Sequence, residues 1–207
     1  MTPHMSIDSI MQAAPVIPVL IVDDVADAVP MAEALVAGGL PVLEVTLRTP
    51  AALDVIAAMA RVPGAIVGAG TVLNPADLAA AIAAGARFIV SPGLTEPLGK
   101  AAIASGVPFL PGIANAGDLM RGLDLGLDRF KFFPAVASGG LPVLKALAAV
   151  FGQVRFCPTG GISLAGAPEW LAQPFITCVG GSWLVTRGER DWAAVTARAR
   201  EAAALRG

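Results

Sequence analysis

Histidine and tyrosine are almost missing from this 207-residue sequence, which contains one histidine, His4, and no tyrosine. A histidine-based metal site or a Ser-His-Asp triad therefore has only His4 to draw on, close to the N-terminus. Charged residues are scarce too, at 14% of the chain, against about 25% in an average soluble protein. The sequence has no basic stripe of the kind that nucleic-acid-binding proteins carry, so we expect no nucleic-acid partner.

Unbroken apolar runs are also missing, although the hydrophobic fraction is 56% and the mean hydropathy is +0.72. A membrane-spanning helix needs about 20 consecutive apolar residues. The longest uncharged stretches, residues 101–117 and 170–186, are both interrupted by glycine and proline. The N-terminus has no cationic start followed by an apolar run, so we expect no secretory signal. These features predict a soluble, cytoplasmic protein without a membrane segment, in which many strands are fully buried.

Cysteine occurs only twice, as Cys157 and Cys178, and each lies in an apolar run. Two cysteines in such positions do not resemble a disulfide framework. We therefore expect both to be buried, reduced thiols in a cytoplasmic protein.

What the sequence does contain is a repeated alternation of two kinds of segment. Short runs rich in β-branched residues recur roughly every 20 to 26 residues, the length of one short strand plus a helix. Strands are predicted at residues 16–22, 41–47, 65–68, 87–90, 107–110, 129–133, 154–157 and 175–179. Helices are predicted in the Ala-rich segments between or after them, at residues 25–36, 51–60, 76–84, 101–105, 119–125, 141–150 and 192–205.

The borders of these segments carry the residues that typically begin and end helices. Asn74, Thr95 and Asn115 are placed as N-caps. Glycines are placed as left-handed C-caps at Gly38, Gly39, Gly85, Gly106, Gly126 and Gly152.

The predicted elements favour one architecture. Strands that are apolar throughout indicate a parallel sheet covered on both faces. Eight of them alternating with helices predict an α/β fold, a single-domain (β/α)8 TIM barrel over residues 1–207. We expect residues 1–14 to form a short N-terminal helical segment that packs on the barrel. An open doubly wound sheet is the alternative, but the first strand lacks the glycine-rich phosphate loop of that fold.

Charged side chains occur in strands where a barrel interior should be apolar. Alternation along the second strand places Glu44, Thr46 and Arg48 on one face, which we expect to point into the barrel near its mouth. Lys131 lies in a later strand with aromatic residues on both sides, a setting that removes water from the amine and favours its use as a nucleophile. Active sites of this fold lie at the carboxyl ends of the strands. These charges therefore predict a catalytic centre, with a structural ion pair as the alternative reading.

Two glycine pairs, Gly160-Gly161 and Gly180-Gly181, follow the last two predicted strands. Paired glycines let backbone N–H groups approach an anion. The loops after strands 7 and 8 are the usual phosphate site of a (β/α)8 barrel. Residues 68–71 end the third strand and offer a further small, polar lining with the Thr71 hydroxyl.

Together these segments resemble the class I aldolases that act on 2-keto-3-deoxy-6-phosphogluconate (KDPG) and on 4-hydroxy-2-oxoglutarate (KHG). The segments that carry the resemblance occur in the same order as in members of the family. They are residues 43–49, 67–74, 91–95, 130–135, 155–162 and 180–185. The resemblance implies cleavage of KDPG to pyruvate and D-glyceraldehyde 3-phosphate, a step of the Entner–Doudoroff pathway, through a lysine Schiff base. It also implies a homotrimer that needs no metal or other cofactor.

The resemblance implies a role for each candidate residue. Lys131 is similar in position to the Schiff-base lysine, and Glu44 to the residue that transfers protons. The remaining matches are the pyruvyl-carboxylate site (Arg48, Thr71 and Lys131), the phosphate site (Gly160, Gly161 and Ser182) and the pocket lining (Thr159, Phe133 and Pro92). Arg48 and Thr159 also favour the gluconate compound over its galactonate analogue.

Other functions stay open from the sequence. A metal-dependent barrel lyase or epimerase would need clustered carboxylates or histidines at strand ends, where only Glu44 qualifies. A non-catalytic barrel that binds phosphorylated metabolites would keep Gly160, Gly161 and Ser182 without needing Lys131. A related 2-keto-3-deoxy sugar-acid aldolase is the third alternative.

Overall fold

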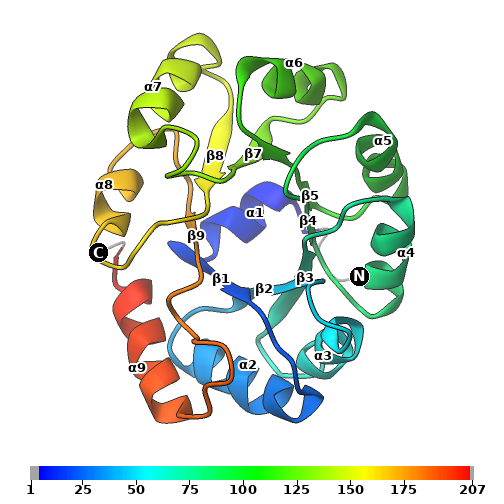
Figure 1. The fold of residues 1–207 in the computed structure, drawn as a ribbon, viewed down its shortest axis with the longest axis vertical. Coiled ribbons are helices and arrows are strands. Elements are labelled where there is room, and N and C mark those ends of the chain that lie inside the picture. Colours follow the sequence, from blue (N-terminus) through cyan, green and yellow to red (C-terminus); the bar gives the residue numbers. More distant parts are fainter. Residues whose placement is uncertain (1–4, 206–207) are drawn as a thin grey trace.

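A computed structural model describes residues 5–205, and its centre is a curled parallel sheet inside a ring of helices (Figure 1). His4 lies outside the described residues. The strands are β1 (Val16–Leu20), β2 (Val42–Thr46), β3 (Ile66–Gly70), β4 (Ile89–Val90), β5 (Phe109–Leu110), β6 (Gly112–Ile113), β7 (Arg129–Phe132), β8 (Arg155–Pro158) and β9 (Val179–Gly181). The helices are α1 (Ile7–Gln12), the 3₁₀ helix η1 (Val25–Asp27), α2 (Ala28–Ala37), α3 (Ala52–Met59), α4 (Pro75–Ala83), α5 (Glu96–Ser105), α6 (Ala116–Asp124), α7 (Gly140–Val150), α8 (Ala167–Leu171) and α9 (Trp192–Ala203).

The strand pairing differs from the predicted single ring of eight strands. Six strands form one parallel sheet in the order β5-β4-β3-β2-β1-β9, and three form another in the order β6-β7-β8. The fifth predicted strand, residues 107–110, corresponds to β5, and β6 was not predicted. Pro111 separates the two strands, and its missing N–H removes a ladder hydrogen bond. Isolated parallel bridges between Phe156 and Ile176 and between Thr159 and Gly180 join β8 to the segment that contains β9.

The other differences lie at element borders. The last strand starts at Val179, four residues later than predicted, and α5 starts at Glu96 rather than at residue 101. The helix predicted at residues 25–36 is divided between η1 and α2. Helix α8 was not predicted, because five residues span too few turns to show a helical period. Within the described residues no helix is both long and apolar enough to cross a membrane.

The predicted N-caps are confirmed, because Asn74, Thr95 and Asn115 each accept a hydrogen bond from the backbone N–H three residues later. The predicted left-handed glycines are confirmed at Gly39, Gly85, Gly106 and Gly126. The prediction is wrong for Gly38 and Gly152. Gly38 has φ −81° and serves close packing instead, since a Cβ there would lie within 3.0 Å of Ala199 on α9.

Two layers of apolar residues flank the strands. The larger layer lies between the sheet and the outer helices. The smaller layer lies inside the curl and consists of Ile10, Met11, Ile17, Val42, Phe88, Val90, Leu110, Cys157 and Cys178. Both cysteines are buried, as predicted. Because Ile10 and Met11 belong to α1, this helix closes the end of the sheet at which the strands begin.

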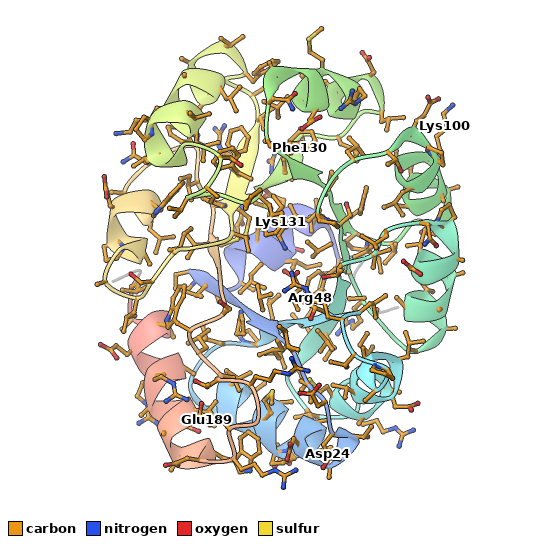
Figure 2. All side chains as sticks on the ribbon, viewed as in Figure 1. Asp24, Arg48, Lys100, Phe130, Lys131 and Glu189 are labelled. Atoms are coloured by element: carbon orange, nitrogen blue, oxygen red, sulfur yellow. The ribbon has the colours of Figure 1, made fainter. Side chains whose placement is uncertain are left out.

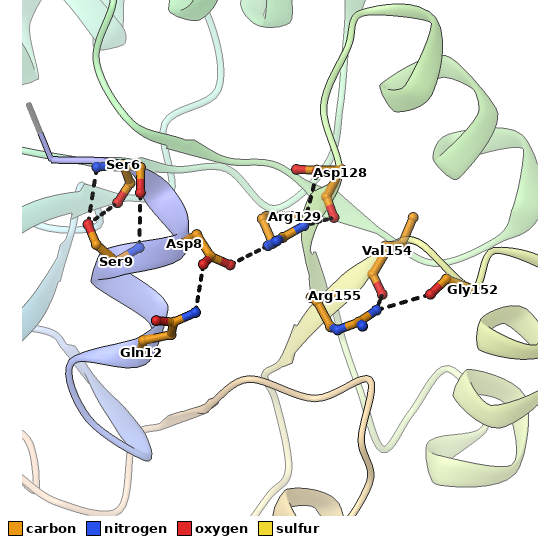
Figure 3. Close-up of polar contacts among 9 residues, drawn as sticks. All are labelled: Ser6, Asp8, Ser9, Gln12, Asp128, Arg129, Gly152, Val154 and Arg155. Carbon is orange, nitrogen blue, oxygen red and sulfur yellow. Dashed lines mark hydrogen bonds and ion pairs between the residues drawn. The ribbon is translucent and has the colours of Figure 1, made fainter.

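Polar contacts fix α1 in that position (Figure 3). Ser6 caps the helix by accepting a hydrogen bond from the N–H of Ser9. The carboxylate of Asp8 accepts a hydrogen bond from Nε of Arg129 at 2.5 Å and from Nε2 of Gln12 at 2.6 Å. Arg129 is the first residue of β7, so this contact attaches the helix to the strand that carries Lys131.

Candidate active site

Glu44 on β2 and Lys131 on β7 face each other inside the curled sheet. The Nζ of Lys131 donates a hydrogen bond to Oε1 of Glu44 at 3.0 Å. The two residues are only 3% and 5% exposed. Removing two charges from water costs several kcal/mol. The attraction between the two side chains, about 3 Å apart, offsets only part of this cost. Such a pair, at the base of a cavity, is the type of arrangement that active sites use.

The surroundings of Lys131 differ in part from the prediction of aromatic residues on both sides. Successive residues of a strand face opposite ways, so Phe130 and Phe132 belong to the apolar layer under the helices. Phe133 alone of the three contacts the amine, with its ring centroid 5.3 Å from Nζ. Figure 2 shows Lys131 and Arg48 near the centre of the ring of helices.

Arg48 lies beside this pair and is oriented by Thr71. The Nε of Arg48 donates a hydrogen bond to Oγ1 of Thr71 at 3.2 Å. Thr71 has φ 60°, a left-handed conformation that costs a β-branched residue about 1–3 kcal/mol. The bond engages Nε and leaves the terminal nitrogens of the guanidinium to meet a planar carboxylate in two parallel hydrogen bonds.

A cavity of about 110 Å³ joins most of the predicted site residues. It is lined by Val19, Arg48, Lys131, Phe133, Thr159, Gly160, Gly161, Ile162, Gly180 and Ser182. Glu44 and Thr71 are connected to this lining through their bonds to Lys131 and Arg48. Pro92 is not brought into it, because it lines a separate cavity together with Val72, Leu73 and Thr95.

Gly180, from the second predicted glycine pair, also lines the cavity, whereas Val19 and Ile162 were not predicted. Ile162 directly follows the first glycine pair, so an extension of that motif would have found it. Val19 is an apolar residue in an apolar strand, and its position at the cavity depends on the curvature of the sheet.

The glycine pair after β8 has a backbone conformation that favours glycine at both positions. Gly160 and Gly161 have φ 105° and 81°, values that L side chains rarely adopt. Their loop is held by hydrogen bonds from the N–H groups of Ala135 and Val136 to the carbonyls of Thr159 and Gly160. The exposed Ser182 lines the same cavity. Backbone amides and a hydroxyl here, with two cationic side chains nearby, suit a ligand that carries two acidic groups.

Ion pairs tie the loop that carries Ser182 to the loop after β1, near α2 and α9 (Figure 2). The hydrogen bond and charge of Arg187 hold the pKa of Asp23 below its ordinary value. The guanidinium of Arg198, whose Nη2 lies 2.6 Å from Oε2 of Glu189 in an ion pair, lowers the pKa of Glu189 and outweighs the burial that raises it. Glu189 also accepts a hydrogen bond from the N–H of Thr186, so it holds the loop at two points.

We expect the contribution of Glu189 to stability to depend on pH. Its folded-state pKa is lowered, so the stabilisation is fully present above the ordinary glutamate pKa and is lost as the pH falls through the folded-state value. Glu189→Gln should therefore lower the free energy of unfolding by more at pH 7 than at pH 3, which lies below the ordinary glutamate pKa. Urea unfolding at both pH values measures this, with the exposed Glu33→Gln as control. An equal loss at both pH values would contradict it.

Comparisons with known proteins identify the family to which the chain is similar. Residues 7–198 match the family described as KDPG and KHG aldolase. The chain is 64% identical over 200 residues to the 2-dehydro-3-deoxy-phosphogluconate aldolase of Zymomonas mobilis, covering 97% of this chain and 96% of that protein. It is 56% identical over 201 residues to the KHG/KDPG aldolase of Escherichia coli, covering 95% and 94%.

Solved structures show the same similarity. The crystal structure of the Zymomonas mobilis ZM4 enzyme with 3-phosphoglycerate superposes with a TM-score of 0.95 at 64% identity, covering 97% of this chain and 96% of that one. The KDPG aldolase of Legionella pneumophila, with pyruvate captured as a covalent carbinolamine, superposes with a TM-score of 0.93 at 45% identity, covering 96% and 98%. Among residues 5–205, no three His, Cys, Asp or Glu side chains gather closely enough to hold a metal ion.

Proposed function

The chain belongs to the KDPG and KHG aldolase family, and from that premise we propose that it cleaves KDPG to pyruvate and D-glyceraldehyde 3-phosphate through a Schiff base on Lys131. The observation that carries this proposal is the buried contact of 3.0 Å between Nζ of Lys131 and Oε1 of Glu44. The proton transfers that follow imine formation need a group that takes up and returns protons, and here that group lies at hydrogen-bond distance from the nucleophile.

The substrate binds through its two acidic groups, a carboxylate and a phosphate, at separate parts of the cavity. The planar guanidinium of Arg48, oriented by Thr71, binds the C1 carboxylate in two parallel hydrogen bonds, which lysine could not do. The 6-phosphate binds the backbone of Gly160 and Gly161 and the hydroxyl of Ser182. Phe133 and Thr159 line the space between these ends. The phosphoglycerate bound by the Zymomonas mobilis enzyme supports a phosphate site in this family.

The proposed cleavage passes through covalent intermediates on Lys131. Lys131 releases its proton to water and attacks C2 as the neutral amine, and the resulting carbinolamine takes up a proton and loses water to give an iminium. Glu44, through a water, accepts the proton of the C4 hydroxyl while the C3–C4 bond breaks and its electrons pass to the iminium nitrogen. D-Glyceraldehyde 3-phosphate leaves, and an enamine of pyruvate stays on Lys131. Protonation at C3 and addition of water then release pyruvate. A pyruvate carbinolamine, the species captured in the Legionella pneumophila enzyme, is the last covalent intermediate of this sequence, formed when water adds and just before pyruvate leaves.

We expect Arg48→Lys to raise KM for KDPG roughly 10- to 100-fold, because the variant keeps the charge and loses the bidentate contact. The value of kcat should change less, since Arg48 holds a part of the substrate that does not react. Steady-state kinetics measure both constants, with the exposed Arg61→Lys as the matched control. A variant with unchanged KM and reduced kcat would remove Arg48 from carboxylate binding.

We propose that the strands close into a (β/α)8 barrel as one domain over residues 1–207. The bridges from β8 toward β9 and the succession of β5 and β6 on either side of Pro111 support closure. The similarity to the Zymomonas mobilis structure over nearly the whole chain supports a single unit. Cooperative urea unfolding with the same midpoint by circular dichroism and tryptophan fluorescence is the expected result.

A homotrimer in the cytoplasm is the assembly that we propose. Large apolar side chains are exposed on the described chain at Leu73, Met120, Val136 and Val150. Exposed apolar side chains of this size are typical of subunit contacts when they lie together. Analytical ultracentrifugation should give three times the chain mass of 20.9 kDa. The mass of a single chain would contradict this assembly.

KHG cleavage is proposed as a second activity of the same site, because the E. coli relative carries both names. KHG has a second carboxylate and no phosphate. It therefore reacts through Lys131, Glu44 and Arg48 and makes fewer contacts with the glycine loops. The proposed place in metabolism is the Entner–Doudoroff pathway.

The test of the main activity is release of pyruvate from KDPG by the purified chain, followed with lactate dehydrogenase and NADH. We expect turnover with an excess of chelator present. Activity that the chelator abolishes would favour the metal-dependent lyase, and binding of KDPG without release of pyruvate would favour a binding protein.

A further inference from the structure

We propose that Gly70 is a positioning residue of the reaction, because the absence of a side chain there lets the Glu44 carboxylate lie against β3 within reach of Lys131. A Cβ added at Gly70 would lie less than 3.0 Å from Oε1, Cγ and Cδ of Glu44. Real Cβ atoms essentially never approach other atoms so closely. The nearest of these atoms, Oε1, is also the one that accepts the hydrogen bond from Nζ of Lys131.

Strand β3 cannot move aside to make room. It pairs with β2 along its whole length, from Val42 with Ile66 to Thr46 with Gly70. The carbonyl of Gly70 accepts a hydrogen bond from the N–H of Leu47 at 2.8 Å. Strand β4 pairs with the other edge of β3. The end of the Glu44 side chain has rotatable bonds, so an added methyl group displaces the carboxylate rather than the strand.

The consequence is specific to proton transfer. This inference rests on the proposed function, in which Lys131 forms the imine and Glu44 moves protons. In Gly70→Ala the amine of Lys131 keeps its place on β7, whereas the carboxylate moves away from it. Imine formation with pyruvate should therefore persist, while exchange of the pyruvate methyl protons and cleavage of KDPG should fall roughly 100-fold.

Two measurements on each variant test the inference. Borohydride trapping of pyruvate reports imine formation, and deuterium exchange at the pyruvate methyl group reports proton transfer. We expect Gly70→Ala to keep trapping and lose exchange. Gly68→Ala is the matched control on the same strand, because its Cβ would meet the ring of Phe88 rather than Glu44. Its ratio of exchange to trapping should equal that of the wild type.

A double-mutant cycle separates positioning from general damage. In a Glu44→Gln background the proton-transfer group is already gone, so adding Gly70→Ala should lower exchange by less than about twofold. If Gly70→Ala does not fold, the double variant with Glu44→Asp should fold, since the shorter side chain makes room. Exchange at the wild-type rate in Gly70→Ala, equal loss of trapping and exchange, or an additive cycle would overturn the inference.

Failure of the proposed function would give a different result. If the wild type forms no pyruvate adduct, or if Glu44→Gln exchanges protons at the wild-type rate, the roles of Lys131 and Glu44 are wrong. If both behave as proposed and Gly70→Ala is normal, only the role of Gly70 is wrong.

Discussion

Lys131→Arg is expected to lower the rate of KDPG cleavage roughly 10⁴-fold or more. Arginine keeps a positive charge opposite Glu44, so the buried charge does not lose its partner. Its guanidinium does not form an imine with a ketone under these conditions, because it stays protonated. The variant should therefore fold and bind substrate but not react. Pyruvate release measured with lactate dehydrogenase, together with urea unfolding, checks both parts of the expectation.

The exposed Lys145→Arg is the control for this variant, since it makes the same exchange on the surface of α7. It should keep wild-type activity. If Lys131→Arg retained more than a few per cent of the wild-type rate while folded, lysine would not be the nucleophile and the cleavage would need another mechanism.

Glu44→Gln is expected to separate imine formation from proton transfer. Glutamine has the size of glutamate and can still accept a hydrogen bond from Nζ of Lys131, so the cavity keeps its shape. It cannot take up a proton, and general acid–base catalysis contributes about 10²- to 10⁴-fold. The variant should trap pyruvate with borohydride while its exchange of methyl protons falls by that factor.

The exposed Glu33→Gln on α2 controls for the loss of one carboxylate and should exchange protons normally. Exchange at the wild-type rate in Glu44→Gln would assign proton transfer to another group. Loss of trapping together with exchange would instead give Glu44 a role in forming the imine.

Local rules were sufficient to predict much of the site. Alternation along residues 41–48 placed Glu44 on the inner face, and the phenylalanines on either side made Lys131 conspicuous. The N-caps at Asn74, Thr95 and Asn115 depend on residues three positions apart, so the sequence alone identifies them. The resemblance to the aldolase family then supplied roles that the spacing could not.

Features that depend on contacts between distant segments could not be predicted in this way. The hydrogen bond between Lys131 and Glu44 joins residues 87 positions apart. The separation of Pro92 from the main cavity depends on the path of a loop. The crowding of Glu44 against Gly70 follows from the register of β2 and β3. The alternation rule, by contrast, could have shown that Phe130 and Phe132 point away from Lys131.

The role of Lys131 is tested most directly by incubating the protein with pyruvate and sodium borohydride and mapping the product by mass spectrometry of peptides. We expect one reduced pyruvyl adduct per chain, on Lys131, in wild type and in Lys145→Arg, and none in Lys131→Arg. No adduct, or an adduct on Lys100 or Lys145, would contradict the claim that Lys131 is the Schiff-base residue.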